Sequence, residues 1–231
     1  MREKIPTHND ITWLLDPGHG GMSIDHNGEY NLYLTKGKRS PTVPPGIYEG
    51  EFNHNISERV YVIGKKRGLK IQRLAVGPVD IPLKSRIKHA NEMHKVLGNC
   101  FYLSIHANAS PKKAWSDAHG PVFFHHPNSK QGAVFASILN HAIWSNVYEY
   151  TRGLKTSRWM KVLRSTKMPA CLAELGFMTN KLEAQFMSTD IGRDLIAHEI
   201  CISMMAFQTK IKAYRDTKSF ETPCLVDGRW F

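Results

Sequence analysis

The sequence has few cysteines, and their spacing is uninformative for metal binding. Only four are present, at Cys100, Cys171, Cys201 and Cys224, and no two of them form a C-x-x-C pair. This spacing argues against a thiolate zinc ribbon. Cys100 and Cys171 lie in or beside apolar segments that resemble strands, so we interpret them as buried free thiols. Unpaired thiols are typical of a reducing compartment.

Long hydrophobic runs are also absent. No stretch approaches the roughly 18–20 uninterrupted apolar residues that a membrane helix needs, so we expect no stable membrane insertion. The opening residues, MREKIPTHND, are polar throughout and lack the apolar region of a secretory signal. We therefore expect the chain to be made in the cytoplasm without a signal peptide.

Acidic residues are too few to balance the basic ones, and the formal net charge is +11. Such a field attracts polyanions. The basic residues are spread along the chain, apart from short groups such as 36–39 and 65–67, and no nucleic-acid-binding motif or aromatic–basic stripe stands out. Nucleic acid and an anionic cell envelope are the two candidate polyanions. We expect no nucleic-acid partner, which leaves the anionic cell envelope.

Predicted strands and helices alternate along the chain. Apolar runs predict strands at 11–15, 69–75, 101–105, 121–124 and 169–175, and apolar residues repeating every three or four positions predict helices at 51–67, 83–97, 131–146 and from 181 onward. Asn180 and Glu183 are expected to begin the last helical region, where each side chain accepts a hydrogen bond from a free backbone N–H group near the other residue. This order indicates a single α/β domain with helices on both faces of a sheet. We assign 1–10 to an N-terminal extension, 11–208 to this domain and 209–231 to a basic C-terminal tail.

Three polar side chains end predicted strands: His19, His106 and Glu174. In open α/β sheets ligands bind beyond the carboxyl ends of the strands, so these groups should meet at one edge. Glu49 opens the first helix and is able to reach the same crevice. Two imidazoles and a carboxylate form a known catalytic zinc set that leaves a position for water. A further carboxylate would take the proton from that water and pass it to the leaving amine. Two of Glu49, Glu51 and Glu174 would therefore serve as the metal ligand and as this proton-transfer group.

Simpler interpretations compete with this one. Twelve histidines are present, and most are expected to be surface or hydrogen-bonded polar residues, namely His26, His54, His89, His94, His141 and His198. His125 and His126 follow a strand and could line a cleft, but the same interpretation is favoured. The glycine-rich turn at 16–21, DPGHGG, is weak evidence alone, because similar turns cradle phosphates.

Six motifs in order carry a resemblance to a known family. They are DPGHGG (16–21), E-x-x-x-N (49–53), L-x-x-R-x-x-x-A-N (83–91), SIHAN (104–108), RGLK (152–155) and AELGFMTN (173–180). Together they resemble the zinc-dependent N-acetylmuramoyl-L-alanine amidases of the amidase-3 type, over about residues 11–207. The resemblance implies a twisted, mostly parallel sheet flanked by helices. It also implies hydrolysis of the bond between the lactyl group of N-acetylmuramic acid and L-alanine in peptidoglycan.

Carried over by position, the resemblance implies roles for single residues. His19, Glu49 and His106 would bind one Zn²⁺ per chain, and Glu174 would be the catalytic acid and base. Arg164, in VLR, matches a position that often faces the substrate, and Asn108 of SIHAN is a second substrate-binding candidate.

Three departures from the family pattern stand out. Glu51 lies two residues from Glu49 and competes for the ligand role, although the E-x-x-x-N register favours Glu49. The basic stretch 35–46, TKGKRSPTVPPG, has no role in the family; we interpret it as a mobile surface loop, with contact to anionic glycan or stem-peptide carboxylates as the sharper alternative. The stretch from His106 to Glu174 is too short to hold the long helix that blocks the zinc site of some relatives, so the enzyme should be unblocked.

These implications define a biological expectation and its alternatives. We expect a monomer that acts on peptidoglycan in the periplasm or cell wall after release from the cytoplasm, as a bacteriolytic phage endolysin does. A zinc peptidase acting on the stem peptide and a non-catalytic peptidoglycan-binding module are the two alternatives.

Overall fold

A six-stranded sheet organises the chain, in the order β4-β1-β5-β8-β6-β7. In the computed structural model, residues 11–20, 23–24, 30–31, 38–77, 79–111, 114–217, 225–226 and 229–230 are described. In chain order the sheet strands are β1 (Thr12–Pro17), β4 (Lys70–Arg73), β5 (Cys100–Asn108), β6 (Val122–His125), β7 (Leu154–Thr156) and β8 (Ala170–Phe177). Two small antiparallel pairs accompany it, β2 (Ser23–Ile24) with β3 (Tyr30–Asn31) and β9 (Leu225–Val226) with β10 (Arg229–Trp230).

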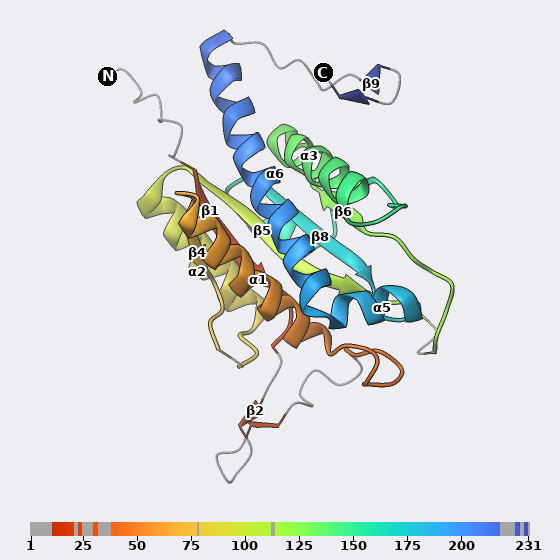
Figure 1. Ribbon diagram of the computed structural model, residues 1–231. Helices are drawn as coiled ribbons and strands as arrows, with labels where there is room; N and C mark the ends of the chain where they lie inside the picture. Colours follow the sequence, from red (N-terminus) through yellow and green to blue (C-terminus); the bar gives the residue numbers. More distant parts are fainter. Residues whose placement is uncertain are drawn as a thin grey trace.

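Helices cover both faces of this sheet. They are α1 (Glu49–Lys66), α2 (Leu83–Leu97), α3 (Lys130–Asn146), α4 (Lys161–Ser165), α5 (Lys181–Ser188) and α6 (Asp190–Thr217). Figure 1 shows α1, α3 and α6 together in front of the sheet, with α2 behind it. Among the described residues, none of these helices combines the length and apolar character that crossing a membrane requires.

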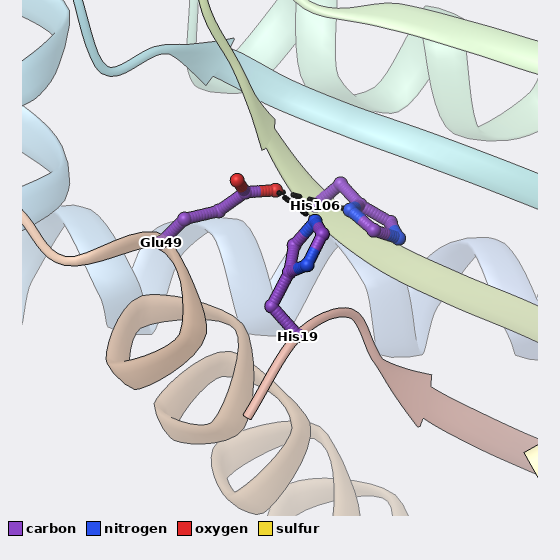
Figure 2. A group of neighbouring side chains, drawn as sticks. All are labelled: His19, Glu49 and His106. Carbon is purple, nitrogen blue, oxygen red and sulfur yellow. Dashed lines mark hydrogen bonds and ion pairs between the residues drawn. The ribbon is translucent and has the colours of Figure 1, made fainter. Parts of the chain in front are cut away.

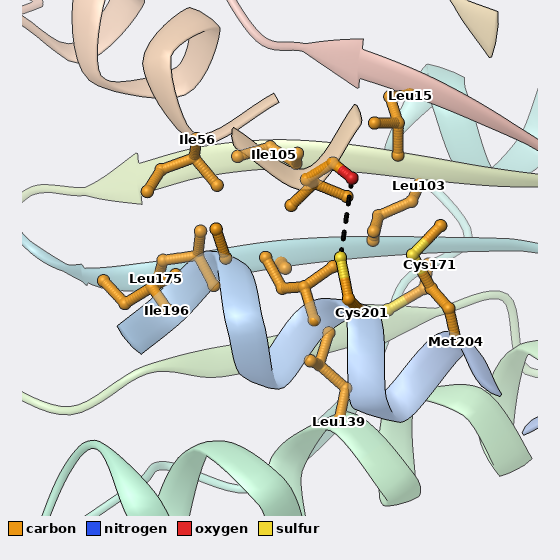
Figure 3. Packing of buried hydrophobic residues seen from close by; sticks show 14 of the residues in the cluster. Leu15, Ile56, Leu103, Ile105, Leu139, Cys171, Leu175, Ile196, Cys201 and Met204 are labelled. Carbon is orange, nitrogen blue, oxygen red and sulfur yellow. Dashed lines mark hydrogen bonds between the residues drawn. The ribbon is translucent and has the colours of Figure 1, made fainter. Parts of the chain in front are cut away.

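The two faces follow from the alternation of side chains along a strand. In β1, Trp13 and Leu15 belong to the core under α1, α3 and α6, whereas Leu14 packs in the second core with residues of α2 and α4. Because both faces are covered, every residue of β1 is buried. Figure 3 shows the larger core, where the Cys201 thiol of α6 lies 3.5 Å from the Val60 carbonyl of α1.

The register of the strands decides which side chains share an edge. β1 runs parallel to β4 and β5, and β5 runs parallel to β8. β6 is antiparallel to β8, and β7 is parallel to β6. His106 of β5 lies opposite Glu174 of β8, so the carboxyl ends of these strands open at one edge.

The predicted α/β architecture, mostly parallel and covered on both faces, is confirmed. Gly98 ends α2 at a φ of 79°, a left-handed conformation that glycine adopts without strain. β7 and α4 were not predicted, because residues 152–168 carry no clear apolar period. α6 continues to Thr217, past the expected boundary at 208, and Ile211 in this extension is buried.

The reciprocal cap at the start of α5 was only half right. The Asn180 side chain accepts from the backbone N–H groups of Leu182 and Glu183, as expected. The Glu183 carboxylate instead accepts from Gly120 N and Phe177 N, each at 2.7 Å, so it ties two loops together. The extension 1–10 lies outside the described residues, as do 35–37 of the basic loop 35–46 and 218–224, 227–228 and 231 of the tail. In the described part of that loop, the Arg39 backbone forms an isolated antiparallel bridge with Tyr48.

Candidate metal centre

The turn after β1 holds His19 in an unusual backbone conformation. Its φ is 58°, which is uncommon for any residue other than glycine and is found at functional sites. Three contacts hold this turn: Gly18 N donates to Ile105 O at 2.8 Å, and Asn53 Nδ2 donates to Gly18 O at 2.7 Å. The third contact is a hydrogen bond between the His54 imidazole and the His19 backbone. Hydrogen bonds from the first two turns of α1 therefore hold the loop that carries His19 in place.

Gly18 is required by the close approach of a neighbouring ring. A Cβ on Gly18 would lie 2.0 Å from His106 Cε1, which is far inside van der Waals contact. The His106 ring therefore packs directly over the turn, and any larger residue at position 18 would displace it.

His19, Glu49 and His106 converge on one point, from the β1 turn, the start of α1 and β5 (Figure 2). The Glu49 Oε1 atom lies 3.4 Å from His19 Nε2 and 3.0 Å from His106 Nδ1. The two imidazole rings meet edge to face, with centroids 5.1 Å apart. All three ligand atoms lie within 4.8 Å of one another, a spacing that allows them to share one metal ion.

The electrostatics of this group suit a cation. Burial, with the neighbouring cations, lowers the pKa of His19 to about 4 against the opposing charge of Glu49, so its imidazole is neutral near pH 7. Burial alone would raise the pKa of Glu49, but the hydrogen bond and charge of His106 outweigh it and leave the pKa lowered. Glu49 is only 1% exposed, and its second oxygen has no hydrogen bond, with Lys38 Nζ at 3.5 Å. A buried, ionised carboxylate with a spare oxygen fits a metal ligand.

Glu174 lies beside this group without joining it. It is half-buried, its Oε2 atom is buried with no hydrogen-bond partner, and its backbone is paired with that of His106. Burial raises its pKa to about 7; the charge of Glu49 adds to the rise, and His106 and Lys38 oppose it. A carboxyl group that exchanges its proton near neutral pH is suited to general acid and base catalysis.

Glu51, the competing ligand, is engaged elsewhere. Its two oxygens accept from the Arg193 guanidinium at 2.6 and 2.8 Å, a bidentate pair. Glu51 is therefore not part of the converging group, whose carboxylate is that of Glu49.

The two predicted substrate-binding residues lie at different ends of the sheet. Asn108 ends β5, two residues beyond His106, and its Oδ1 accepts from Ala109 N at 2.8 Å. Arg164 is exposed on α4 and lines a hollow of about 300 Å³ with Ala170, the first residue of β8. The structure places Asn108 at the edge where His19, Glu49 and His106 converge, but it does not place Arg164 there.

Sequence reasoning missed the residues that support the ligands. His54 was expected to be an ordinary polar residue, and Asn53 was noted only as the last position of E-x-x-x-N. Their spacing from Glu49 was the available signal, because positions four and five residues along a helix lie about one turn further on. Only the fold shows that the turn after β1 passes this part of α1.

An α/β sheet with two histidines and a glutamate converging at its carboxyl edge defines a domain with a candidate mononuclear metal centre. A profile of the amidase-3 family, described as N-acetylmuramoyl-L-alanine amidase, matches residues 14–205. The chain belongs to this family.

Individual relatives agree with this assignment. The chain is 26% identical over 191 residues to N-acetylmuramoyl-L-alanine amidase LytC of Bacillus subtilis, covering 82% of this chain and 34% of LytC. It is also 26% identical over 200 residues to the probable cell wall amidase LytH of Staphylococcus aureus, covering 86% of this chain and 58% of LytH. The chain thus spans less than two thirds of the length of these relatives. The crystal structure of N-acetylmuramoyl-L-alanine amidase from Clostridium difficile 630 superposes with a TM-score of 0.69 at 25% identity, over 91% of this chain and all of that one.

Proposed function

We propose that this chain is a zinc-dependent N-acetylmuramoyl-L-alanine amidase that hydrolyses the amide bond between the lactyl group of N-acetylmuramic acid and L-alanine in peptidoglycan. One observation carries the proposal: the ligand atoms of His19, Glu49 and His106 lie within 4.8 Å of one another, next to Glu174, whose Oε2 atom is buried without a hydrogen-bond partner. Membership of the family supplies the substrate class.

The residues divide the chemistry between them. His19, Glu49 and His106 would hold the zinc ion, which would lower the pKa of a bound water to about 7 and polarise a carbonyl group. Glu174 accepts the proton that water loses as its oxygen attacks the lactyl carbonyl carbon. Glu174 then donates that proton to the alanine nitrogen as the C–N bond breaks. The products are a lactyl carboxylic acid and a free amine.

Two residues are proposed to contact substrate. Asn108 lies at the edge where the scissile bond would be held, so its loss should raise KM for a short muropeptide. Arg164 lies near the opposite end of β8. Its predicted role therefore requires a substrate that extends along the sheet, and KM for long glycan strands is the measurement that tests it.

The decisive experiment incubates purified peptidoglycan with native, metal-stripped and zinc-restored protein, followed by mass spectrometry of the fragments. An amidase frees the amine of L-alanine and leaves the lactyl carboxylate, and only the zinc-containing samples should do so. Cleavage within the stem peptide would instead support the zinc peptidase. Sedimentation with peptidoglycan without any cleavage would support the binding module.

Two variant pairs test the individual roles. Glu174→Gln should keep zinc and lose turnover by about 10²–10⁴-fold, because the proton transfer would have no acceptor. Glu92→Gln, an exposed change on α2, is its control. Glu49→Ala should lose zinc, whereas Glu51→Ala should keep it because Glu51 pairs with Arg193. Zinc retained by Glu49→Ala and lost by Glu51→Ala would reverse the ligand assignment.

We further propose that the enzyme is a monomer with one zinc ion that lyses bacteria from the cell-wall side, as an endolysin does. The net charge of +11 supports approach to an anionic envelope. Clearing of a suspension of permeabilised bacteria tests the lytic role, and zinc content per chain together with light scattering tests the stoichiometry.

A further inference from the structure

The segment 155–167, which forms part of β7, the connection and α4, has an unusual charge pattern. It contains four exposed basic residues besides Arg164: Lys155, Arg158, Lys161 and Lys167. No aspartate or glutamate occurs between Glu149 and Glu174. We call these four basic residues, together with the 83%-exposed Trp159, the β7–α4 surface.

The charges of this surface are not neutralised by the protein. Within the described part of the chain, none of its four basic residues forms an ion pair, although ion pairs are common elsewhere, as at Arg59, Arg73 and Arg193. On α2, which packs against α4, Glu92 pairs with Lys88 at 3.8 Å. Among the described residues, the surface therefore presents a positive charge that no carboxylate pairs with.

A hollow adjoins the same segment. It has a volume of about 300 Å³ and is lined by Arg164 together with His126, Asn128 and Ser129, and its lining contains no carboxylate. Ser129 caps the N-terminus of α3, where the free N–H groups and the helix dipole favour an anion. The hollow thus extends the positive surface with hydrogen-bond donors.

A simpler explanation covers only part of this pattern. β7 is the edge strand of the sheet, and an exposed lysine on an edge strand discourages pairing with other chains. That explanation accounts for Lys155. It does not account for Arg158, Lys161 and Lys167, which lie beyond the strand, or for an exposed tryptophan among them.

We propose that the β7–α4 surface binds a phosphodiester polymer of the cell wall, apart from the metal centre, and so retains the enzyme on walls that carry such polymers. The choice of partner rests on the proposed function, which brings the chain to peptidoglycan. Repeating phosphate groups complement several exposed basic side chains that form no ion pair with any residue that the structure describes, because lysine and arginine bind phosphate through charge-assisted hydrogen bonds. The Trp159 ring supplies an apolar face for a sugar or polyol.

Nucleic acid has the same phosphodiester chemistry but fits the surface less well. Proteins that bind single strands without sequence preference use several aromatic side chains on which successive bases stack. The segment 155–167 offers one aromatic residue, Trp159.

The test measures binding to cell walls that carry phosphodiester polymers and to the same walls after hydrofluoric acid has removed them. All proteins carry Glu174→Gln so that the wall stays intact. The parent should sediment with the polymer-bearing walls about tenfold more tightly than with the stripped walls, and the difference should shrink with added salt. The surface variant combines Lys155→Gln, Arg158→Gln, Lys161→Gln and Lys167→Gln. Its affinity for the polymer-bearing walls should fall by about tenfold, since exposed ion pairs contribute little singly but add up.

The matched control removes the same charge elsewhere, with Lys65→Gln, Lys66→Gln, Lys181→Gln and Lys212→Gln on α1, α5 and α6. Its affinity for the polymer-bearing walls should fall by less than about twofold. An equal loss in both variants would overturn the proposal in favour of net charge alone. Equal binding to both wall preparations, or tighter binding of the surface to single-stranded DNA, would also overturn it.

A second readout separates this proposal from the proposed function. With Glu174 restored, both sets of substitutions should leave hydrolysis of a soluble muropeptide without phosphodiester unchanged. If the protein with native Glu174 and an unchanged surface failed to cleave that muropeptide, the amidase function would be contradicted. The wall-binding comparison would still decide the role of the surface.

Discussion

Arg86 and Asp16 form a buried ion pair at the base of the turn that carries His19. The Arg86 Nη1 atom donates to Asp16 Oδ1 at 2.5 Å and to Pro17 O at 3.2 Å, and its Nε donates to Ile81 O at 2.9 Å. The second Asp16 oxygen accepts from Ser104 Oγ at 2.8 Å. Because Asp16 begins the turn that carries His19, this pair ties α2 to the turn and to β5.

Arg86→Gln should destabilise the protein by about 3–5 kcal/mol, because it leaves the fully buried Asp16 carboxylate without its counter-charge. Urea unfolding followed by circular dichroism measures the change. The control is Arg59→Gln, whose partners Asp190 and Asp194 are exposed, and it should cost less than about 1 kcal/mol. Similar losses in the two variants would show that burial does not set the value of the Arg86 pair.

Gly18→Ala should weaken zinc binding by at least about tenfold, the scale of disturbing a group that orients a metal ligand. The added Cβ would overlap the His106 ring, so the ring must shift, and its contact with Glu49 would change. Competition with a chromophoric chelator measures the affinity. Gly98→Ala is the control: nothing lies within 4 Å of its Cβ, but its φ is 79°, so it should reduce stability and leave zinc affinity unchanged. Unchanged affinity in Gly18→Ala would mean that His106 is not held by this contact.

Zinc binding should release a proton near neutral pH. Burial lowers the pKa of His106, but the hydrogen bond to Glu49 and the charges of Glu174, Glu49 and Asp16 outweigh it, and the net pKa is raised. Below that raised pKa the imidazole holds a proton that the metal must displace, so zinc affinity should fall as the pH falls through it. His19, with a pKa of about 4, is already neutral and should not contribute. Calorimetry in two buffers of different ionisation enthalpy counts the protons, and a count of zero at pH 6 would be inconsistent with this assignment.

The buried thiols should be unreactive in the folded protein. Burial raises the pKa of Cys100 to about 11 and of Cys201 to about 12, and it raises the pKa of Cys171 further still. Because the thiolate is the reactive form, a Cys224→Ser variant should react with a thiol reagent at pH 8 only after unfolding. Rapid reaction of the native variant would show that one of these three thiols is accessible.

Much of the fold followed from local patterns. The limits of α2 and α3 were predicted closely, at 83–97 and 131–146, because apolar residues repeat with a clear helical period in both segments. β7 and α4 were missed, because Leu154–Thr156 is short and exposed and exists as a strand only through its pairing with β6. The end of α6 was also missed, since composition alone does not show that Ile211 is buried.

The sequence by itself determined the types of residue at the site and their order along the chain, because the motifs place His19, His106 and Glu174 at or near the ends of buried strands. The E-x-x-x-N register favoured Glu49 over Glu51 but did not show which of them lies beside the histidines. Only the tertiary structure shows this, because the Arg193 side chain, far away in the sequence, binds Glu51 while Glu49 turns toward the two histidines. The same holds for the support of His19 by α1 and of Asp16 by Arg86: such contacts join distant segments, and no local pattern encodes which segments become neighbours.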